Sequence, residues 1–191
     1  LAGEDAIVRM TTSGQILGKY QVGKRPAGIG THLGRIYVAN SGSGTVSILT
    51  LSGQVIQTTP VGEMPWDLAA RTDPGVHPGP YLYVTLAGEN KVAKLALDGQ
   101  RGYVIDREIS SFGFNTAQGP RSILLLPDGG IFIACDEGKI TSMSQSGQTL
   151  GTFEADSGAY EIACRLKSSE GLEILGVRPD SSRAAMPALS E

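Results

Sequence analysis

Short apolar runs separated by polar turns extend along the whole chain. The run Arg35–Asn40 is rich in β-branched and aromatic residues, the glycine-rich turn Ser41–Gly44 follows it, and a second apolar run occupies Thr45–Leu49. Runs of this kind, bounded by Gly, Ser and Asn, predict β-strands, and glycine takes the positive φ that tight turns need. No helical periodicity interrupts them. The pattern therefore predicts an all-β protein.

One turn phrase, Ser-Gly-Gln or Asp-Gly-Gln, follows a hydrophobic run four times. Its copies begin at Ser13, Ser52, Asp98 and Ser146. They recur every 40–50 residues or so, roughly the length of a repeat that holds several short strands. A repeat of this kind is typical of the blade of a β-propeller. A propeller is a scaffold whose function lies in its loops, so the repeat indicates architecture far more than activity.

The repeats can be aligned strand by strand, with the strands of each unit named A to D from the propeller axis outwards. The first complete unit runs from Val22 to Gly62. Its strands A, B, C and D are expected at Arg25–Gly30, Arg35–Asn40, Thr45–Leu49 and Val55–Thr58. The second and third units begin their strands A at Pro65 and Pro120. The sequence therefore predicts three complete blades with four strands each.

The two ends of the chain each predict half of a further blade. Leu1–Asp5 parallels Leu86–Asn90, the turn between strands B and C, so the chain opens with strands C and D and closes with strands A and B. These strands are expected at Ile7–Met10, Leu17–Tyr20, Tyr160–Cys164 and Leu172–Leu175. Because their pairing would cover two exposed sheet edges, we expect one composite blade. Residues 1–177 then form about four blades, and residues 178–191 form a polar, poorly ordered tail.

The most specific motif lies between Val22 and Leu97. It comprises Val22-Gly23-x-x-Pro26 with Ile36–Ser41 and Thr45–Ile48, and a second copy at Val61-Gly62-x-x-Pro65 with Leu82–Thr85. These residues resemble the YVTN repeat, a relative of the NHL repeat. The resemblance implies a β-propeller, usually of about six or seven blades, and a surface, periplasmic or secreted protein. Four blades are fewer than this number, so three arrangements stay open. The ring closes at four blades, copies of the chain associate, or the chain is part of a larger propeller; the last two are favoured.

Loops from strand D to strand A share one face of a propeller with the turns from strand B to strand C, and that face usually binds ligands. Trp66, Arg121 and Tyr160 follow the first position of successive strands A, so we expect them around the channel mouth. These residue types dominate binding energy at interfaces and suit a peptide, protein or glycan. Packing between blades is the alternative for Trp66 and Tyr160. The candidate ligand-binding face comprises Arg25, Asn40, Trp66, Asn90, Asn115, Arg121, Asp136 and Tyr160.

Asp67 and Glu161 lie one residue further along their strands A, two units apart. In a ring of four blades they would face one another across the axis, where two carboxylates could hold Ca²⁺. The residues resemble gluconolactonase-like propellers, which implies an axial metal and hydrolase or lactonase activity as an alternative function. Carboxylates that cap the starts of strands in solvent are the commoner arrangement. Our main expectation is therefore a protein without a cofactor.

The remaining reactive residues give little support for catalysis. His32 and His77 lie in turns between strands A and B, on the face opposite the expected site. Leu126–Phe132 resembles part of the streptogramin-lyase-like propellers but lacks the histidine that those enzymes use. Cys135 and Cys164 belong to no Cys-x-x-Cys motif, so zinc or redox chemistry is not expected. Buried free thiols are favoured, and a bond between them stays open.

The composition of the chain argues against two kinds of partner, nucleic acid and membrane. The chain has 191 residues, of which 40% are hydrophobic and 18% charged, and its formal net charge is −3. This charge, without a Lys/Arg cluster, argues against nucleic acid. No apolar run approaches the roughly 18–20 residues that cross a bilayer. We therefore expect a non-enzymatic binding or scaffold propeller in an extracytoplasmic location, as a homo-oligomer or as part of a larger propeller.

Overall fold

The computed structural model describes residues 1–72, 80–98, 102–105, 114–116, 118–136, 138–155, 161–167, 171–177 and 183–185. Strands and turns make up this part of the chain, and its one helical element is the short 3-10 helix η1 at Ala2–Glu4. The expectation of an all-β protein is confirmed. Within the described ranges, no helix has the length and apolarity that crossing a membrane requires.

Three complete blades are antiparallel sheets whose strands follow one another in chain order. The first comprises β3 (Pro26–His32), β4 (Arg35–Asn40), β5 (Thr45–Thr50) and β6 (Val55–Pro60). The second comprises β7 (Pro65–Thr72), β8 (Pro80–Leu86), β9 (Lys91–Asp98) and β10 (Gly102–Ile105), and the short β11 (Phe114–Asn115) also pairs with β9. The third comprises β12 (Pro120–Leu125), β13 (Ile131–Cys135), β14 (Lys139–Met143) and β15 (Thr149–Glu154). The three blades predicted from the repeat are therefore present.

A partial sheet lies at each end of the chain. β1 (Ala6–Met10) pairs with β2 (Ile16–Gln21), and β16 (Glu161–Lys167), β17 (Gly171–Val177) and β18 (Arg183–Ala185) form the other. In the described chain β1 pairs with β2 alone, and β17 lies between β16 and β18. The two ends therefore do not join into the expected composite blade. β18 lies within the segment that was expected to be a polar tail.

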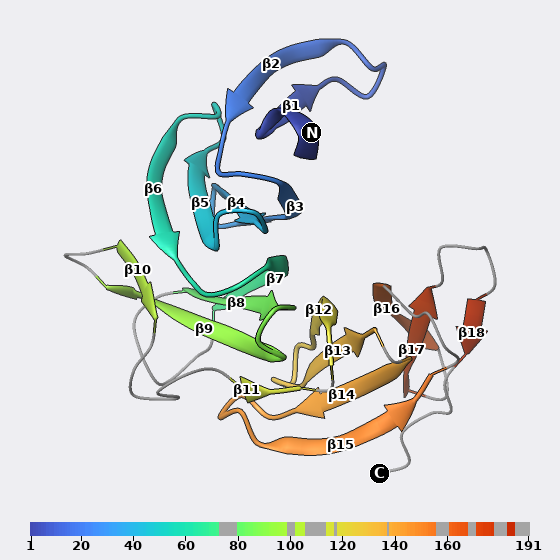
Figure 1. Cartoon of the computed structure of the whole chain (residues 1–191). Coiled ribbons are helices and arrows are strands. Elements are labelled where there is room, and N and C mark those ends of the chain that lie inside the picture. Colours follow the sequence, from blue (N-terminus) through green and yellow to red (C-terminus); the bar gives the residue numbers. More distant parts are fainter. Residues whose placement is uncertain are drawn as a thin grey trace.

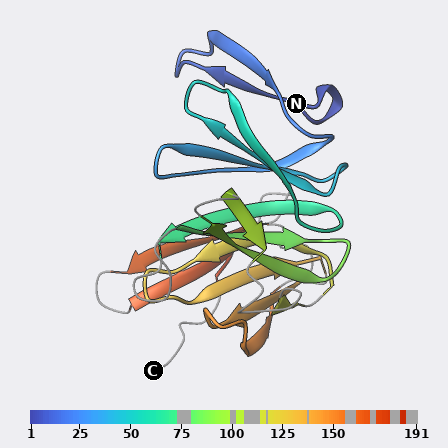
Figure 2. The same ribbon diagram turned by 90° about the vertical axis from the view of Figure 1, so that its left-hand side faces the viewer.

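The sheets follow an open arc. Figure 1 shows β3, β7, β12 and β16 along the inside of the arc and the two partial sheets at its separate ends. Figure 2, turned by 90°, shows the first two sheets stacked above the others, with the N-terminus at the top. The three complete blades and the sheet of β16 pack face to face through layers of buried side chains. Among the described residues, these layers do not extend to the sheet of β1 and β2.

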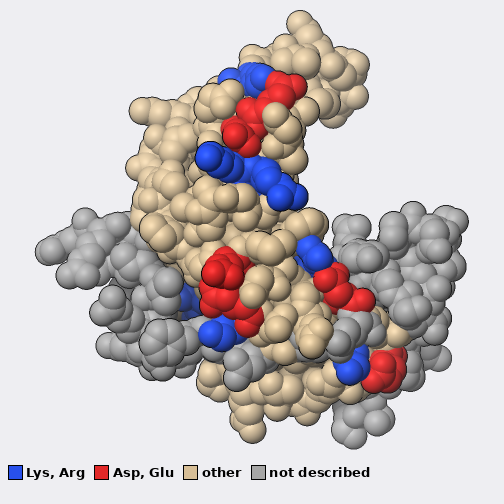
Figure 3. Space-filling model, in the orientation of Figure 1, with Lys and Arg blue, Asp and Glu red and all other residues tan. Residues whose placement is uncertain are grey.

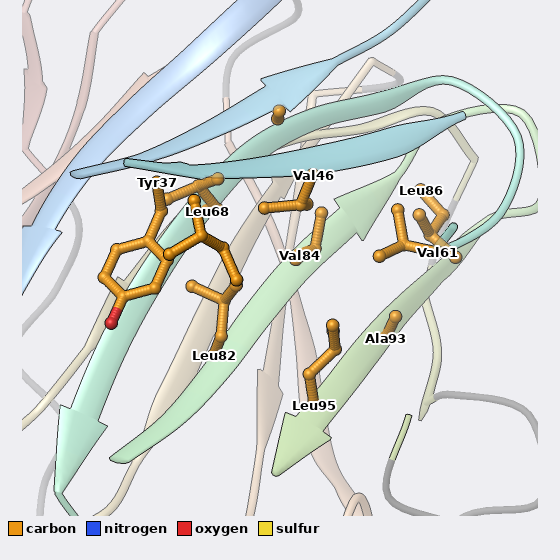
Figure 4. Close-up of a cluster of buried hydrophobic side chains, with 11 residues drawn as sticks. Tyr37, Val46, Val61, Leu68, Leu82, Val84, Leu86, Ala93 and Leu95 are labelled. Carbon is orange, nitrogen blue, oxygen red and sulfur yellow. The ribbon is translucent and has the colours of Figure 1, made fainter. Parts of the chain in front are cut away.

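Strand B of a blade contributes to two of these layers. In β8, Leu82 and Val84 pack against the first blade, whereas Tyr81 and Tyr83 pack against the third. Successive side chains of a strand point to opposite faces, so a strand covered on both faces reads as a continuous apolar run. Figure 4 shows the first of these layers, in which side chains of β4 and β5 face those of β7, β8 and β9.

The recurring Ser-Gly-Gln phrase forms the turn between strands C and D. Its glycines Gly14, Gly53 and Gly147 have φ of 87°, 93° and 85°, which glycine adopts without strain. In the first copy the Thr11 hydroxyl accepts the N–H of Gln15 at 3.0 Å, and the other two copies repeat this contact at 3.1 Å. The phrase therefore recurs because it builds a turn. The glycine of the remaining copy, Gly99, lies outside the described residues.

Candidate binding site

D–A loops and B–C turns meet on one face of the propeller, which we call the loop face. The D–A loops of the three complete blades each end, just before the opening proline of strand A, in a residue with left-handed backbone: Arg25 (φ 50°), Met64 (φ 49°) or Gly119 (φ 59°). The carbonyl oxygen of that residue accepts the N–H of the first residue of the B–C turn. The pairs are Arg25–Ser41, Met64–Ala87 and Gly119–Asp136, each at 3.0 Å. Loop and turn of one blade are therefore fixed together.

The B–C turns also hold the next blade. Asp5 and Asn90 have equivalent positions and left-handed backbones, with φ of 52° and 55°. Asp5 Oδ1 accepts the N–H of Arg25 at 2.8 Å, and Asn90 Oδ1 accepts that of Gly119 at 2.9 Å. Leu1–Asp5 and Leu86–Asn90 have similar sequences because each segment makes this same contact with the next blade. Asn90 is exposed on the loop face, but its carbonyl oxygen is already engaged.

Three of the predicted binding residues come together where the second and third blades meet. The Arg121 guanidinium lies over the Trp66 ring, with Cζ 4.1 Å from the ring centroid. Its Nε and Nη2 donate to the two carboxylate oxygens of Asp136 at 2.7 and 2.8 Å. The side chains of Arg121 and Asp136 are 19% and 35% exposed, and Trp66 is partly buried. This Trp66–Arg121–Asp136 cluster is a preformed arrangement that remains open to solvent.

The repeat explains why these side chains meet. Trp66 and Arg121 each follow the opening proline of an inner strand, and the two strands, β7 and β12, lie side by side. Gly119 leaves the space that Asp136 needs, because a Cβ there would lie 2.2 Å from Asp136 Oδ2. Its positive φ also favours glycine.

Arg25 and Asn40, the predicted ligand contacts of the first blade, have opposite environments. Arg25 is exposed on the loop face. Asn40 is 0% exposed, and its Nδ2 donates to Thr45 Oγ1 at 3.1 Å and to Ser47 Oγ at 2.9 Å. Asn40 therefore ties the end of β4 to β5 inside the blade, and we leave it out of the binding surface proposed below.

Two other predicted contacts fall largely outside the described residues. Asn115 pairs with Lys91 through the backbones of β11 and β9, but its side chain is not described. Tyr160 lies wholly outside the described residues, as does His77. The contributions of Asn115 and Tyr160 to a binding face stay predictions.

Glu63 is a loop-face residue that the sequence analysis missed. It holds the position of Lys24 in the next D–A loop and is exposed. Its N–H donates to Glu89 Oε1 at 2.8 Å. The repeated Gly-x-x-Pro spacing was the signal that would have found it, because this spacing places Lys24 and Glu63 at the same point of successive loops.

Asp67, the predicted axial metal ligand, joins two blades through its carboxylate. Oδ1 accepts the N–H of Leu68 at 2.8 Å, and Oδ2 accepts the N–H of Ile123 in the next blade at 3.1 Å. Ca²⁺ takes roughly six to eight oxygen ligands, and the described residues contain no group of three or more His, Cys, Asp or Glu that could hold a metal. Glu161 lies in β16, with its side chain outside the description. The contacts of Asp67 are those of a link between strands, and a calcium site at Asp67 and Glu161 stays a prediction.

His32 and Cys135 lie away from the cluster. His32 ends β3, next to the A–B turn, with Nε2 3.0 Å from Thr72 Oγ1. Cys135 is fully buried, and the side chain of Cys164 lies outside the described residues. A bond between the two cysteines therefore stays a prediction.

No family profile matches the sequence, and no curated protein matches it. Solved structures do match. The chain is similar to a hydrazine synthase of Kuenenia stuttgartiensis, with a TM-score of 0.69 and 16% identity over 96% of this chain and 60% of that one. It is similar to a streptogramin B lyase, with a TM-score of 0.68 and 16% identity over 100% of this chain and 64% of the lyase.

A third similar structure is BBS1N in complex with ARL6DN, with a TM-score of 0.67 and 10% identity over 96% of this chain and 58% of that one. The chain thus spans about three fifths of the length of the structures that it matches. At identities this low the likeness shows the fold alone. The fold of this chain is that of a β-propeller.

Proposed function

We propose that the loop face is a non-enzymatic binding surface that captures a peptide segment of another protein, with the Trp66–Arg121–Asp136 cluster at its centre. The observation that carries the proposal is the stacking of Arg121 on Trp66 while both side chains stay partly exposed. Trp and Arg are the residue types that supply most of the binding energy at protein interfaces.

Rigidity of the cluster supports binding. Two charge-assisted hydrogen bonds fix the Arg121 guanidinium, and the N–H of Asp136 donates to the carbonyl oxygens of Gln118 and Gly119 at 3.1 and 3.0 Å. A side chain that is already ordered loses little rotational freedom when a ligand arrives, so more of the contact energy appears as affinity.

The alternatives have less support. Sugar hydroxyls need planar polar side chains to receive them, yet Asn90 and Asp136 are engaged within the propeller and Asn40 is buried. A hydrolase with axial calcium would need the carboxylate of Asp67, whose two oxygens accept backbone N–H groups. The fold itself does not decide, because one similar structure is a lyase and another is a complex with a second protein.

Membership of the YVTN/NHL repeat family and an extracytoplasmic location remain part of this proposal. Their support is the repeated signature at Val22–Pro26 and Val61–Pro65. The same holds for a homo-oligomer or a larger propeller.

An array of random short peptides tests the proposal. The parent protein should bind a subset of the peptides, and Trp66→Ala should weaken that binding by about tenfold or more, as expected for a hot spot. The emission of Trp66, the only tryptophan in the chain, should shift when those peptides are added in solution. Arg121→Ala should also weaken binding, because it removes the group that holds the ring.

Two controls separate binding from folding. Trp66→Phe keeps an aromatic ring beside Arg121 and should retain part of the affinity. Arg35→Ala removes an exposed arginine next to the A–B turn, away from the loop face, and should bind as the parent does. Thermal melting checks that each variant is folded. Unchanged binding by a folded Trp66→Ala protein would overturn the proposal.

A further inference from the structure

We infer that the occupant of the loop face is an extended peptide segment that places an acidic side chain on Lys24 and Arg25 and an apolar or aromatic side chain on Trp66. This inference rests on the function proposed above and adds the chemistry of the partner and its direction across the face. Its evidence is the distribution of charge, the rigidity of one loop and the small residue Ala27, which holds the position of Trp66 in the preceding blade.

Among the described residues on or next to the loop face, three positive side chains have an acidic partner. Lys19 pairs with Glu4, Lys91 Nζ lies 3.7 Å from Glu89 Oε2, and Arg121 pairs with Asp136. Figure 3 accordingly shows basic and acidic side chains alternating along the arc instead of gathering in one patch. Lys24 and Arg25 differ from these residues. Both are exposed, and neither makes an ion pair within the described part of the chain.

The loop that carries these two cations is firmly held. The N–H of Arg25 donates to Asp5 Oδ1 at 2.8 Å, and its carbonyl oxygen accepts the N–H and the hydroxyl of Ser41 at 3.0 and 2.8 Å. The side-chain stem of Arg25 lies against Gly42, where an added Cβ would be 3.1 Å from three of its carbons. The N–H of Lys24 donates to Ser43 Oγ at 3.2 Å. The two charges are therefore presented from a fixed backbone.

The second contact is the ring of Trp66. Arg121, from the next blade, covers one side of the ring. In the preceding blade the equivalent position is Ala27, which is exposed and carries only a methyl group. β3 and β7 are in close contact there, since a Cβ on Gly28 would lie 2.5 Å from the carbonyl oxygen of Trp66. The methyl group of Ala27 cannot cover the ring of Trp66 as the Arg121 guanidinium does, so we place the apolar side chain of the partner on this side of the ring.

Geometry connects the two contacts. Arg25 and Ala27 are two residues apart, or about 7 Å along an extended chain. One extended peptide can therefore reach the cations and the ring with side chains two positions apart, because alternate side chains lie on the same face. Glu63 replaces Lys24 in the second blade, where it is exposed and makes no ion pair within the described residues. Glu63 therefore sets the direction of the peptide across the two blades. An acidic group is attracted to the first blade and repelled at the second.

Fluorescein-labelled peptides with Gly-Ser flanks test this inference by fluorescence polarisation. Each carries two test residues separated by one glycine, which places both on the same face of an extended chain. Named by their test residues, the peptides are Glu-Phe, its neutral match Gln-Phe, its reversed-charge match Lys-Phe, and Glu-Ala. The parent protein should bind Glu-Phe most tightly, and its affinity should fall as salt rises. Gln-Phe should bind about fivefold more weakly, as expected for the loss of contacts with two exposed cations.

The diagnostic variant is Lys24→Gln with Arg25→Asn, because Asn tolerates the left-handed backbone of Arg25 while removing its charge. It should bind Glu-Phe and Gln-Phe equally. Trp66→Ala should weaken both peptides and should abolish the advantage of Phe over Ala. Arg35→Gln, an exposed arginine outside the loop face, should leave every affinity unchanged.

Other outcomes separate this inference from the proposed function. If Lys-Phe binds as tightly as Glu-Phe, or if the double variant keeps the preference for Glu-Phe, the inference is wrong while the loss of binding in Trp66→Ala still supports a peptide-binding face. If heparin binds and Glu-Phe does not compete with it, the partner is a sulfated glycan and the inference fails. If none of the peptides binds and Trp66 emission never changes, both proposals fail.

Discussion

Four successive inner strands carry an aliphatic side chain at the same position, but the first of these side chains has a different environment. Leu68, Ile123 and Ile162 are 5%, 7% and 6% exposed, whereas Ile29 is 58% exposed. Each buried residue packs against the blade before it; Leu68, for example, belongs to the layer shown in Figure 4. Before β3 the described chain has only the pair β1–β2. Burial at this position therefore depends on the neighbouring blade, not on the residue type.

The position just before it shows the same contrast. Asp67 Oδ2 accepts the N–H of Ile123, and Ser122 Oγ accepts the N–H of Ile162 at 3.5 Å, so each side chain links its blade to the next. Gly28 has no side chain to do this, and the backbone of the second blade occupies the space instead. At this position, the first and second blades are therefore in contact through their backbones. The second and third blades, and the third blade and β16, are joined there by a polar side chain.

Leu68→Ala should have the largest effect on stability. It removes a buried side chain between two blades, so the free energy of unfolding should fall by about 2–5 kcal/mol. Ile29→Ala removes a largely exposed side chain and should change that free energy by less than about 1 kcal/mol. Urea unfolding followed by circular dichroism measures both. Equal effects of the two substitutions would mean that another part of the protein, or a second copy, covers Ile29 in solution.

Asp67→Ala should have the second largest effect. It leaves the N–H groups of Leu68 and Ile123 without their partner, and each buried unpaired donor costs about 1–3 kcal/mol. Asp67→Asn keeps one carbonyl oxygen and should lose less. Amide hydrogen exchange at Ile123 should accelerate in the alanine variant. A stable alanine variant with unchanged exchange would show that the carboxylate is not structural and would renew interest in an axial metal.

Gly28→Ala sharpens the comparison at the first interface. Its Cβ would lie 2.5 Å from the carbonyl oxygen of Trp66 and 2.8 Å from the Cα of Asp67, so the two inner strands would have to separate. The expected loss of stability is about 1–3 kcal/mol, typical of overpacking. Gly3→Ala is the control, since nothing lies within 4 Å of its Cβ. Thermal melting that failed to distinguish the two variants would contradict the close contact of β3 and β7.

The smallest effect is expected at the partial sheet of β1 and β2. Lys19, through its hydrogen bond and its positive charge, holds the pKa of Glu4 below its ordinary value. A lowered carboxyl pKa stabilises the folded state at neutral pH, and this contribution is lost as the pH falls through that pKa. Because both side chains are largely exposed, Glu4→Gln should lower the melting temperature only slightly at neutral pH and not at all in acid. A large shift would mean that this sheet is held more tightly than its contacts indicate.

Local features were predictable because they depend on neighbouring residues in the chain. The turn at Gly14 needs positive φ and a hydroxyl three residues earlier, and both requirements can be read from the sequence. The strand β4 has the predicted bounds, Arg35–Asn40, because its apolar residues continue to a turn. The meeting of Trp66 and Arg121 also follows from the repeat, which places them at one position of successive strands.

Other features depend on distances between segments that the sequence does not contain. Asn40 has the sequence context of an exposed turn residue, yet the turn folds over it and buries it. The strands at the two ends have the right types to pair, but they lie at separate ends of the arc, and in the described chain each pairs only within its own sheet.

The sequence by itself determined strand positions, turns and the all-β blade repeat, because period-two alternation and glycine conformation act over a few residues. Only the tertiary structure decided which equivalent side chains are buried, which polar groups are engaged and which cations form ion pairs with described residues. These properties depend on the packing of one blade against the next. They therefore differ between Ile29 and Leu68, although the two residues hold the same position in the repeat.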